Sequence, residues 1–305
     1  VDECYLDFTD IADRFPSPLD AAFLMKNGIR ERFGFTVNIG ISENKLLAKM
    51  ASDFKKPDRT HTLSVNEIPQ KLWPLPVKEL FFVGRASARK LYNLGIYTIG
   101  DLAQTDVEIL RRHMKKQGEL IWNFANGRDF SLVEAVPPPN KGYGNSTTIP
   151  VDVTTSSQAS LVLLALAETV GARLRKDGKK AEVLSVSAKD YLFRTSSHQC
   201  RLPAPTNITE ELHFHACRLF LELWDGCPVR HLGIHTGRIL DWDAMRQMEL
   251  FDTRDYGKLE RLDRAVDTIR RRYGMDAVKR AVFLDSPIDH MSGGISREKR
   301  SVDYK

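Results

Sequence analysis

The sequence predicts an α+β protein built from several folded units. Three observations predict this class: a strand pattern followed by a helix pattern near the N-terminus, a helical stretch in the middle, and alternating strands and helices in the second half. Prolines gather at 69–76 and again at 131–141, where they interrupt regular structure and mark boundaries between units. The element order predicted for the second half is βαββαβ.

Size, charge and cysteine content limit the classes of function. At 305 residues the chain has room for two or three domains, each with a core of its own. Hydrophobic residues make up 42%, as in soluble globular proteins, and no apolar run reaches the length of a membrane span, so we expect no membrane partner. The formal net charge of +5 favours an anionic partner. The four cysteines show no Cys-x-x-Cys spacing, which predicts a reduced, cytoplasmic setting without a zinc site.

The first ten residues carry the acidic groups on which the functional prediction depends. Cys4, Leu6 and Phe8 alternate with more polar neighbours, which predicts a strand. The pair Asp2 and Glu3 stands at its start. Adjacent side chains on a strand point to opposite faces, so these carboxylates can share a cation only at a turn or a strand end. Hard divalent ions such as Mg²⁺ take carboxylate oxygens, whereas the simpler alternative is a solvent-exposed acidic doublet.

Two helices and a strand are predicted before the first proline-rich stretch. Apolar residues recur at helical intervals over 18–33, and Gly34 stands at the expected C-cap. Alternation over 35–41 predicts a strand, and helical spacing returns over 47–54, with Ser42 as the predicted N-cap. The second helix and its C-terminal end carry four lysines: Lys45, Lys49, Lys55 and Lys56.

Together these stretches resemble the palm of Y-family translesion DNA polymerases, the DNA polymerase IV and V type. The resemblance is carried by VDECYLDFTD at 1–10 and VNIGISENKLLAKMASDFKKPD at 37–58. It implies that Asp2 and Glu3 bind two catalytic Mg²⁺ ions, and that Lys56, which precedes a proline, contacts the incoming deoxynucleoside triphosphate. The alternative for Lys56 is a solvated lysine at a helix C-terminus, where the helix dipole favours positive charge.

The family pattern also includes groups for which this chain offers no counterpart. A further metal-binding Asp, an aromatic steric gate and most of the fingers subdomain precede the segment that 1–10 resembles. The chain opens on Val1 inside this motif, so we expect it to be a fragment. Asp7 and Asp10 are acidic and close in sequence, but the family pattern gives neither of them a role in binding metal.

Residues 69–130 predict a small helical unit. The motif LFFVGRA at 80–86, followed by a second leucine- and glycine-containing stretch, predicts a helix-hairpin-helix whose backbone amides face a DNA phosphate. It resembles the thumb of the same family and implies DNA contacts at Gly84 and Arg85. Ala86 stands where the family hairpin carries its second glycine, and an ordinary helical turn is the alternative.

The thumb-like unit continues into a proline-rich linker. Thr105 with Glu108 predicts a capping box for its next helix, and Gly127 is the predicted end of its last helix. The prolines at 137–139 predict an extended linker over 131–143, which cannot continue a helix.

The second half predicts a sheet that is covered on one face. The expected strands are 146–152, 183–193, 198–202 and 229–240, and the expected helices are 158–176 and 210–224. The motifs YGNSTTIP and PVRHLGI resemble the first and last strands of the little-finger domain of the same family, here 144–240. The open sheet face would then contact DNA phosphates without reading bases, although scattered surface charge is the alternative. The expected DNA-contacting residues are Lys189, Arg194, Arg201, Arg230 and Arg238.

The tail, 241–305, contains a short docking motif. QMELF at 247–251 fits the Gln-x-x-Leu-Phe pentapeptide by which bacterial polymerases dock on the sliding clamp. Leu250 and Phe251 would enter an apolar cleft while Gln247 hydrogen-bonds at its rim, unless the match is a coincidence. A helix is predicted over 257–273, with Leu259, Leu262, Val266 and Ile269 as its apolar stripe, and disorder is predicted from Ser292.

The resemblance therefore covers nearly the whole chain. Its parts are a partial palm (1–68), a thumb (69–130), a linker (131–143), a little finger (144–240) and a clamp-binding tail (241–305). It implies an error-prone, lesion-bypassing DNA polymerase that extends primer-template DNA by two-metal nucleotidyl transfer, in DNA repair and the SOS response. The alternative is a non-catalytic DNA- and clamp-binding fragment, because the first palm strand and its metal-binding Asp have no counterpart.

Overall fold

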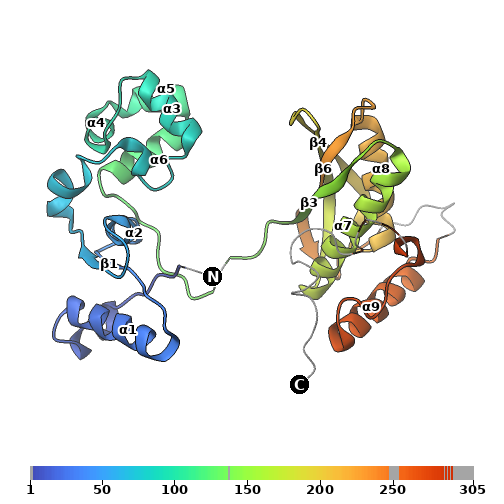
Figure 1. Cartoon of the computed structure of the whole chain (residues 1–305), viewed down its shortest axis with the longest axis horizontal. Helices are drawn as coiled ribbons and strands as arrows, with labels where there is room; N and C mark the ends of the chain where they lie inside the picture. The colour runs from blue at the N-terminus through green and yellow to red at the C-terminus, as the bar shows by residue number, and fades with distance from the viewer. Residues whose placement is uncertain are drawn as a thin grey trace. The chain divides into compact units, whose positions relative to one another are not determined.

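The computed structural model divides the chain into two compact units, 1–137 and 138–305, which are described separately (Figure 1). The structure describes residues 3–136, 138–246 and 254–284, together with Ser286, Ile288 and His290. The division falls inside the predicted proline linker. Mixed helix and sheet content confirms the α+β class.

The first unit begins with a small α/β arrangement. Its elements are η1 (Thr9–Arg14), α1 (Pro18–Phe33), β1 (Ile39–Ile41), α2 (Lys45–Asp53) and β2 (Thr60–Thr62). Strands β1 and β2 pair in parallel, with Ile39 opposite Thr60. Helix α1 has the predicted bounds: Ser17 accepts a hydrogen bond from the Asp20 amide at its start, and Gly34 ends it with a φ of 71°.

The predicted strand over 1–10 is wrong for the residues that the structure describes. Residues 3–8 form no strand, and the 3₁₀ helix η1 follows them directly. Leu6 is exposed, so the alternation does not mark a buried face. A strand also needs a neighbour for its ladder hydrogen bonds, and no described strand pairs with this segment. The next predicted strand is shorter than expected, because β1 starts at Ile39 rather than Phe35.

Short helices complete the first unit. They are η2 (Val65–Glu67), η3 (Ile68–Leu72), η4 (Val77–Glu79), α3 (Arg85–Asn93), α4 (Ile99–Gln104), α5 (Val107–Met114) and α6 (Lys116–Ala125). Leu47 of α2 belongs to the same buried cluster as Leu91 of α3, Leu110 of α5 and Ile121 of α6. Helix α2 therefore shares one hydrophobic core with helices α3, α5 and α6, and this packing fixes its position against them.

The capping prediction in this region needs one correction. The capping box forms at α4, between Thr98 and Asp101, and not between Thr105 and Glu108. Helix α5 is capped instead by Asp106, whose carboxylate accepts a hydrogen bond from the Glu108 amide at 2.9 Å. An Asp at the N-cap reaches the nearby amides directly, so it replaces the predicted threonine.

The second unit has the predicted βαββαβ order. Its elements are β3 (Gly142–Val153), α7 (Ser156–Lys176), β4 (Lys179–Asp190), β5 (Thr195–Thr206), α8 (Thr209–Leu223) and β6 (Val229–Asp241), followed by α9 (Tyr256–Tyr273) and η5 (Ala281–Phe283). The sheet order is β3-β6-β4-β5, and all neighbouring strands are antiparallel. Helices α7 and α8 lie on one side of this sheet (Figure 1).

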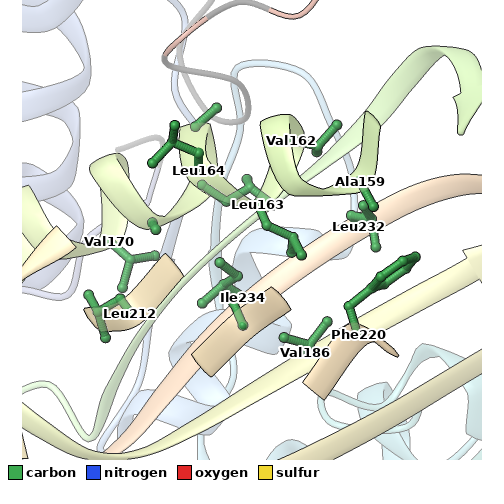
Figure 2. Close-up of a cluster of buried hydrophobic side chains, with 14 of the residues drawn as sticks. Ala159, Val162, Leu163, Leu164, Val170, Val186, Leu212, Phe220, Leu232 and Ile234 are labelled. Atoms are coloured by element: carbon green, nitrogen blue, oxygen red, sulfur yellow. The ribbon is translucent and has the colours of Figure 1, made fainter. Parts of the chain in front are cut away.

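The core of the second unit lies between these two helices and the sheet. Leu163 and Val170 of α7 point toward Leu212 of α8 and toward Val186 and Ile234 of the sheet (Figure 2). All of these side chains are buried. Since side chains alternate along a strand, residues beside Val186 and Ile234 face the opposite, uncovered side.

Helix α9 is present as predicted, but its predicted apolar stripe is only partly covered. Leu262 is 53% exposed and Ile269 is also exposed, Leu259 and Val266 are half-buried, and Asp263 and Arg270 are buried. Charged side chains on α7 meet this face: Arg175 bonds to Asp263 and Asp267, and Glu168 bonds to Arg270. Ion pairs therefore help to orient α9 on the rest of the unit.

Candidate active site and nucleic-acid interface

Glu3 lies against α2, the helix whose C-terminal end leads to Lys56. Its carboxylate accepts a hydrogen bond from Nζ of Lys49, which lies on α2 and is only 14% exposed. The two residues are far apart in sequence, so this contact brings the N-terminal segment to the helix. Asp2, the other predicted metal ligand, lies outside the described residues.

Lys49 also reaches Asp53 on the next turn of α2, and Asp53 in turn holds Lys56. The Lys49 and Asp53 charged groups are 3.3 Å apart, and those of Asp53 and Lys56 are 2.7 Å apart. Partial burial raises the pKa of Asp53, but hydrogen bonds from Lys56 and Lys49 outweigh it, so this pKa lies below its ordinary range. Burial lowers the pKa of Lys49, but its bonds to Glu3 and Asp53 bring it above the ordinary range.

Both ends of α2 are fixed by neighbouring segments. Asn44 is the N-cap in place of the predicted Ser42: its side chain accepts from the Leu47 amide and donates to the Gly127 carbonyl, each at 2.9 Å. Beyond the C-terminal end, Asp58 forms an ion pair with Arg30 of α1. The Lys26 ammonium of α1 donates to the Asp58 carbonyl at 3.1 Å. Lys56 thus lies between two anchored positions.

The predicted hairpin contact lies at the N-terminus of α3. Gly84 is the N-cap residue, and Gly84, Arg85 and Ala86 are all exposed. Gly84 has no side chain with which to cap this helix, so among the described residues its first amides remain available to an anion from outside. A Cβ atom added at Gly84 would meet nothing within 4 Å. The fold of the chain itself therefore leaves room for a larger residue at this position. A phosphate that approached the backbone would need the space that glycine leaves open.

The uncovered sheet face of the second unit is polar and smooth. Across the four strands the register aligns three rows: Gly144, His235, Ser185 and Gln199; Ser146, Gly233, Ser187 and Ser197; and Thr148, His231, Lys189 and Thr195. These positions are small or polar. A Cβ atom at Gly233 would lie 2.8 Å from Ser187 Oγ and 3.0 Å from the Ser146 Cβ, so glycine keeps the centre of this face flat.

The five predicted DNA-contacting residues have different surroundings. Lys189 lies in the third row of the open face and forms no ion pair within the described part of the chain. Arg201 and Arg238 both bond to Glu182, at 2.5 and 3.5 Å. Arg194 forms an ion pair with Asp190 at 2.6 Å, and Arg230 forms one with Asp152 at 3.1 Å. Four of the five residues are therefore paired with carboxylates of this chain.

Arg230 lies at an irregular point of β6. The register with β4 shifts between Lys189, which pairs with His231, and Asp190, which pairs with Val229, so strand alternation does not fix the side to which Arg230 points. Its guanidinium lies 5.3 Å from the Phe193 ring centroid as well as against Asp152. Arg230 thus belongs to the end of the sheet, where the bidentate pair orients it.

Comparison with known proteins identifies the family. The impB/mucB/samB family pattern matches residues 1–53, the HHH motif of the IMS family matches 65–96, and the impB/mucB/samB C-terminal domain matches 140–250. DNA polymerase IV of Clostridium acetobutylicum is 39% identical over 285 residues, which covers 93% of this chain and 72% of that protein. The chain belongs to the Y-family DNA polymerases.

Other Y-family relatives agree. DNA polymerase IV of Acetivibrio thermocellus is 37% identical over 288 residues, covering 93% of this chain and 72% of the relative. DNA polymerase IV 2 of Bacillus subtilis is 35% identical over 292 residues, covering 93% of this chain and 70% of the relative. Among solved structures, a Y-family DNA polymerase chimera has a TM-score of 0.65 and 21% identity, covering 77% of this chain and 68% of its own. The last comparison shows a shared fold.

Two features of the candidate site were missed by reading the sequence. Lys49 and Asp53 stand four residues apart, and Asp53 and Lys56 three apart, which is the spacing of ion pairs on a helix. That signal was present in the sequence. His231 and His235 on the open face were also missed, although they alternate with the buried Leu232 and Ile234.

The predicted clamp-binding residues Gln247, Leu250 and Phe251 lie outside the described residues. The residues on either side of that stretch contact α8. Arg246 bonds to Glu211 at 2.5 Å, and the Arg254 guanidinium lies 5.3 Å from the Phe214 ring centroid. No helix of the described residues is long and apolar enough to cross a membrane.

Proposed function

We propose that this chain is a translesion DNA polymerase that adds deoxynucleotides to a primer on a DNA template. The observation that carries the proposal is the contact between Glu3 and Lys49, because it sets the acidic motif beside the helix that leads to Lys56. The names of the relatives, DNA polymerase IV, support the same reaction. In this proposal Lys56 binds the triphosphate, and its ammonium reaches phosphate oxygens as a point charge.

The donor groups of the site fit a hard divalent cation. Glu3 offers carboxylate oxygens, and an ammonium group already lies against them where a metal cation would bind. Glu3 and Asp2 would hold the two Mg²⁺ ions, which would lower the pKa of the primer hydroxyl and neutralise charge on the triphosphate. The residues of the chain then have separate tasks: carboxylates fix the ions, and Lys56 orients the nucleotide.

DNA is held, in this proposal, by two surfaces that contact its backbone. The uncapped N-terminus of α3, at Gly84 and Arg85, offers amides and one positive charge to a phosphate. The open face around Lys189 is flat, polar and free of bulky side chains at its centre. Such surfaces bind phosphates of any sequence, as a polymerase that moves along its template requires.

The alternative function is a non-catalytic module that binds DNA and the sliding clamp. In the polymerase proposal, by contrast, the protein uses two-metal chemistry, docks on the sliding clamp, works in the cytoplasm and acts in the SOS response. The clamp would be bound through Gln247, Leu250 and Phe251.

Primer extension tests the proposal against this alternative. Asp2→Ala and Glu3→Ala, each made in a chain completed with the first palm strand of the family, should abolish nucleotide addition while DNA affinity stays within about twofold, because carboxylates do not attract phosphates. Near-normal extension by both variants would contradict the metal role. Tight DNA binding without any extension by the unaltered chain, with added Mg²⁺, would favour the non-catalytic module.

A further inference from the structure

Four charged residues of the first unit form a continuous chain of alternating sign. Glu3 bonds to Lys49, Lys49 lies 3.3 Å from Asp53, and Asp53 lies 2.7 Å from Lys56. The two outer groups, Glu3 and Lys56, are the more exposed ones, whereas Lys49 at an inner position is largely covered. The outer groups are therefore the ones that can turn toward a ligand.

The two inner residues need no outside partner. Lys49 and Asp53 are one helical turn apart on α2, where oppositely charged side chains pair favourably on their own. If Glu3 and Lys56 both leave the chain of charges, one carboxylate and one ammonium remain, and they neutralise each other. The outer groups can thus be released together without leaving an unpaired charge beside the helix.

We propose that Lys49 and Asp53 are an exchange pair that positions Glu3 and Lys56 and couples their release. This inference rests on the proposed function, in which Glu3 binds a divalent cation and Lys56 binds the triphosphate. When Glu3 turns to a cation, Lys49 shifts its hydrogen bond wholly to Asp53. Asp53 then holds Lys56 less strongly, and Lys56 is available to the triphosphate.

The exchange pair predicts a reciprocal effect between the two ligands. A triphosphate that draws Lys56 away leaves Asp53 to Lys49, which weakens the hold of Lys49 on Glu3. Cation binding at Glu3 and triphosphate binding at Lys56 should therefore favour each other through the protein, in equal measure in both directions. Independent surface ion pairs would show no such coupling.

Mn²⁺ binding, measured by the electron paramagnetic resonance signal of free Mn²⁺, tests the first half. In the absence of nucleotide, Lys49→Met should bind Mn²⁺ at least threefold more tightly, because the competing ammonium is gone. Lys45→Met is the matched control: Lys45 lies on the same helix, donates to the Leu132 carbonyl at 2.7 Å and is outside the chain of charges. Unchanged or weaker binding by folded Lys49→Met and Lys49→Gln would overturn the proposal.

A double-mutant cycle separates exchange from simple charge effects. Asp53→Asn should weaken Mn²⁺ binding at least twofold in the otherwise unaltered chain, because Lys49 then stays on Glu3. In the Lys49→Met background the same change should have little effect. Equal effects in both backgrounds would mean that Asp53 acts only as a distant negative charge, which would overturn the exchange pair.

Nucleotide binding without DNA tests the coupling itself. The affinity for dATP should rise when Mn²⁺ saturates the site, and the Lys49→Met and Asp53→Asn variants should each lose at least half of that gain. Glu3→Gln distinguishes a failure of the proposed metal role from a failure of the exchange pair alone. If Glu3→Gln leaves Mn²⁺ binding unchanged, the metal role of Glu3 fails and the exchange pair with it; if Glu3→Gln abolishes binding but the cycle is additive, only the exchange pair fails.

Discussion

Arg270 of α9 donates a hydrogen bond to Glu168 of α7 at 2.9 Å, with side chains that are only 5% and 4% exposed. Glu168 also accepts from Arg280 at 2.6 Å, so one carboxylate serves two guanidinium groups. A charge buried to this degree is tolerated only where it is paired and hydrogen-bonded. Glu168, together with Arg175, thus attaches α9 and the segment after it to the little finger.

Removing Glu168 should destabilise the second unit. In Glu168→Ala, the buried Arg270 guanidinium loses its carboxylate, and loss of one member of a buried pair costs about 3–5 kcal/mol. Urea unfolding would measure the free energy. Glu260→Ala is the control, because Glu260 lies on α9 with Arg270 but makes only a 3.8 Å contact with Lys180, and a surface pair contributes less than about 1 kcal/mol. Equal stability of the two variants would contradict this account.

The fold of the little finger was predictable, but the attachment of α9 was not. Alternation along the strands and the apolar spacing of α7 and α8 are local signals, and they gave the βαββαβ order correctly. In α9 the local signal was an apolar stripe, of which Leu262 and Ile269 are exposed and Leu259 and Val266 are half-buried. The buried face was decided by where α7 places Glu168 and Arg175, and that depends on tertiary structure.

In the candidate site, likewise, the residues could be predicted from the sequence but their contacts could not. Glu3 and Lys56 could be named from the sequence because the family motifs carry them. Their contacts could not, because the bond between Glu3 and Lys49 spans 46 residues and joins a segment without regular structure to a helix. The partners of the little-finger arginines were missed for a related reason: the register that puts Glu182 beside Arg201 and Arg238 is a property of the folded sheet.

Stability of the second unit should fall as the pH drops below about 6.5, the ordinary pKa of histidine. Burial lowers the pKa of His213 on α8, so the folded state binds a proton less readily than the unfolded chain. The unfolded state therefore gains protons first as the pH falls through this range, at up to about 1.4 kcal/mol per pH unit for one proton. His213→Gln should reduce this dependence in urea unfolding, and an unchanged dependence would contradict this account.

The clamp motif predicts a loss of binding without a loss of stability. Leu250→Ala with Phe251→Ala removes two apolar side chains, each contributing roughly 1.5–3 kcal/mol on full burial in a partner. Since about 1.4 kcal/mol is a tenfold change, bacterial sliding-clamp affinity should fall at least about a hundredfold. Binding can be measured by surface plasmon resonance and folding by thermal melting. A lower melting temperature with unchanged clamp affinity would show that the match to the motif is a coincidence.

The open sheet face should bind the phosphate backbone of DNA. Lys189→Ala should weaken duplex binding equally for unrelated sequences and reduce the slope of log K against log salt by about one, the change expected for one phosphate contact. Arg218→Ala is the control, because Arg218 lies on α8, which covers the other side of the sheet, and pairs with Glu222 at 3.4 Å. Fluorescence anisotropy at several salt concentrations gives both quantities. A sequence-dependent loss, or equal losses in the two variants, would argue against this surface.

Glu182 should limit how strongly the same domain binds DNA. Hydrogen bonding from Arg201, together with the nearby Arg238, holds the pKa of Glu182 below its ordinary range, so the carboxylate stays ionised at neutral pH. Glu182→Gln would leave two exposed guanidinium groups without their shared counter-charge. These groups can then pair with phosphates, and duplex affinity at low salt should rise by about two- to fivefold, with a steeper salt dependence. Glu222→Gln removes a carboxylate from α8 instead and should leave both quantities unchanged. An unaltered affinity in Glu182→Gln would mean that Arg201 and Arg238 serve the sheet and not the DNA.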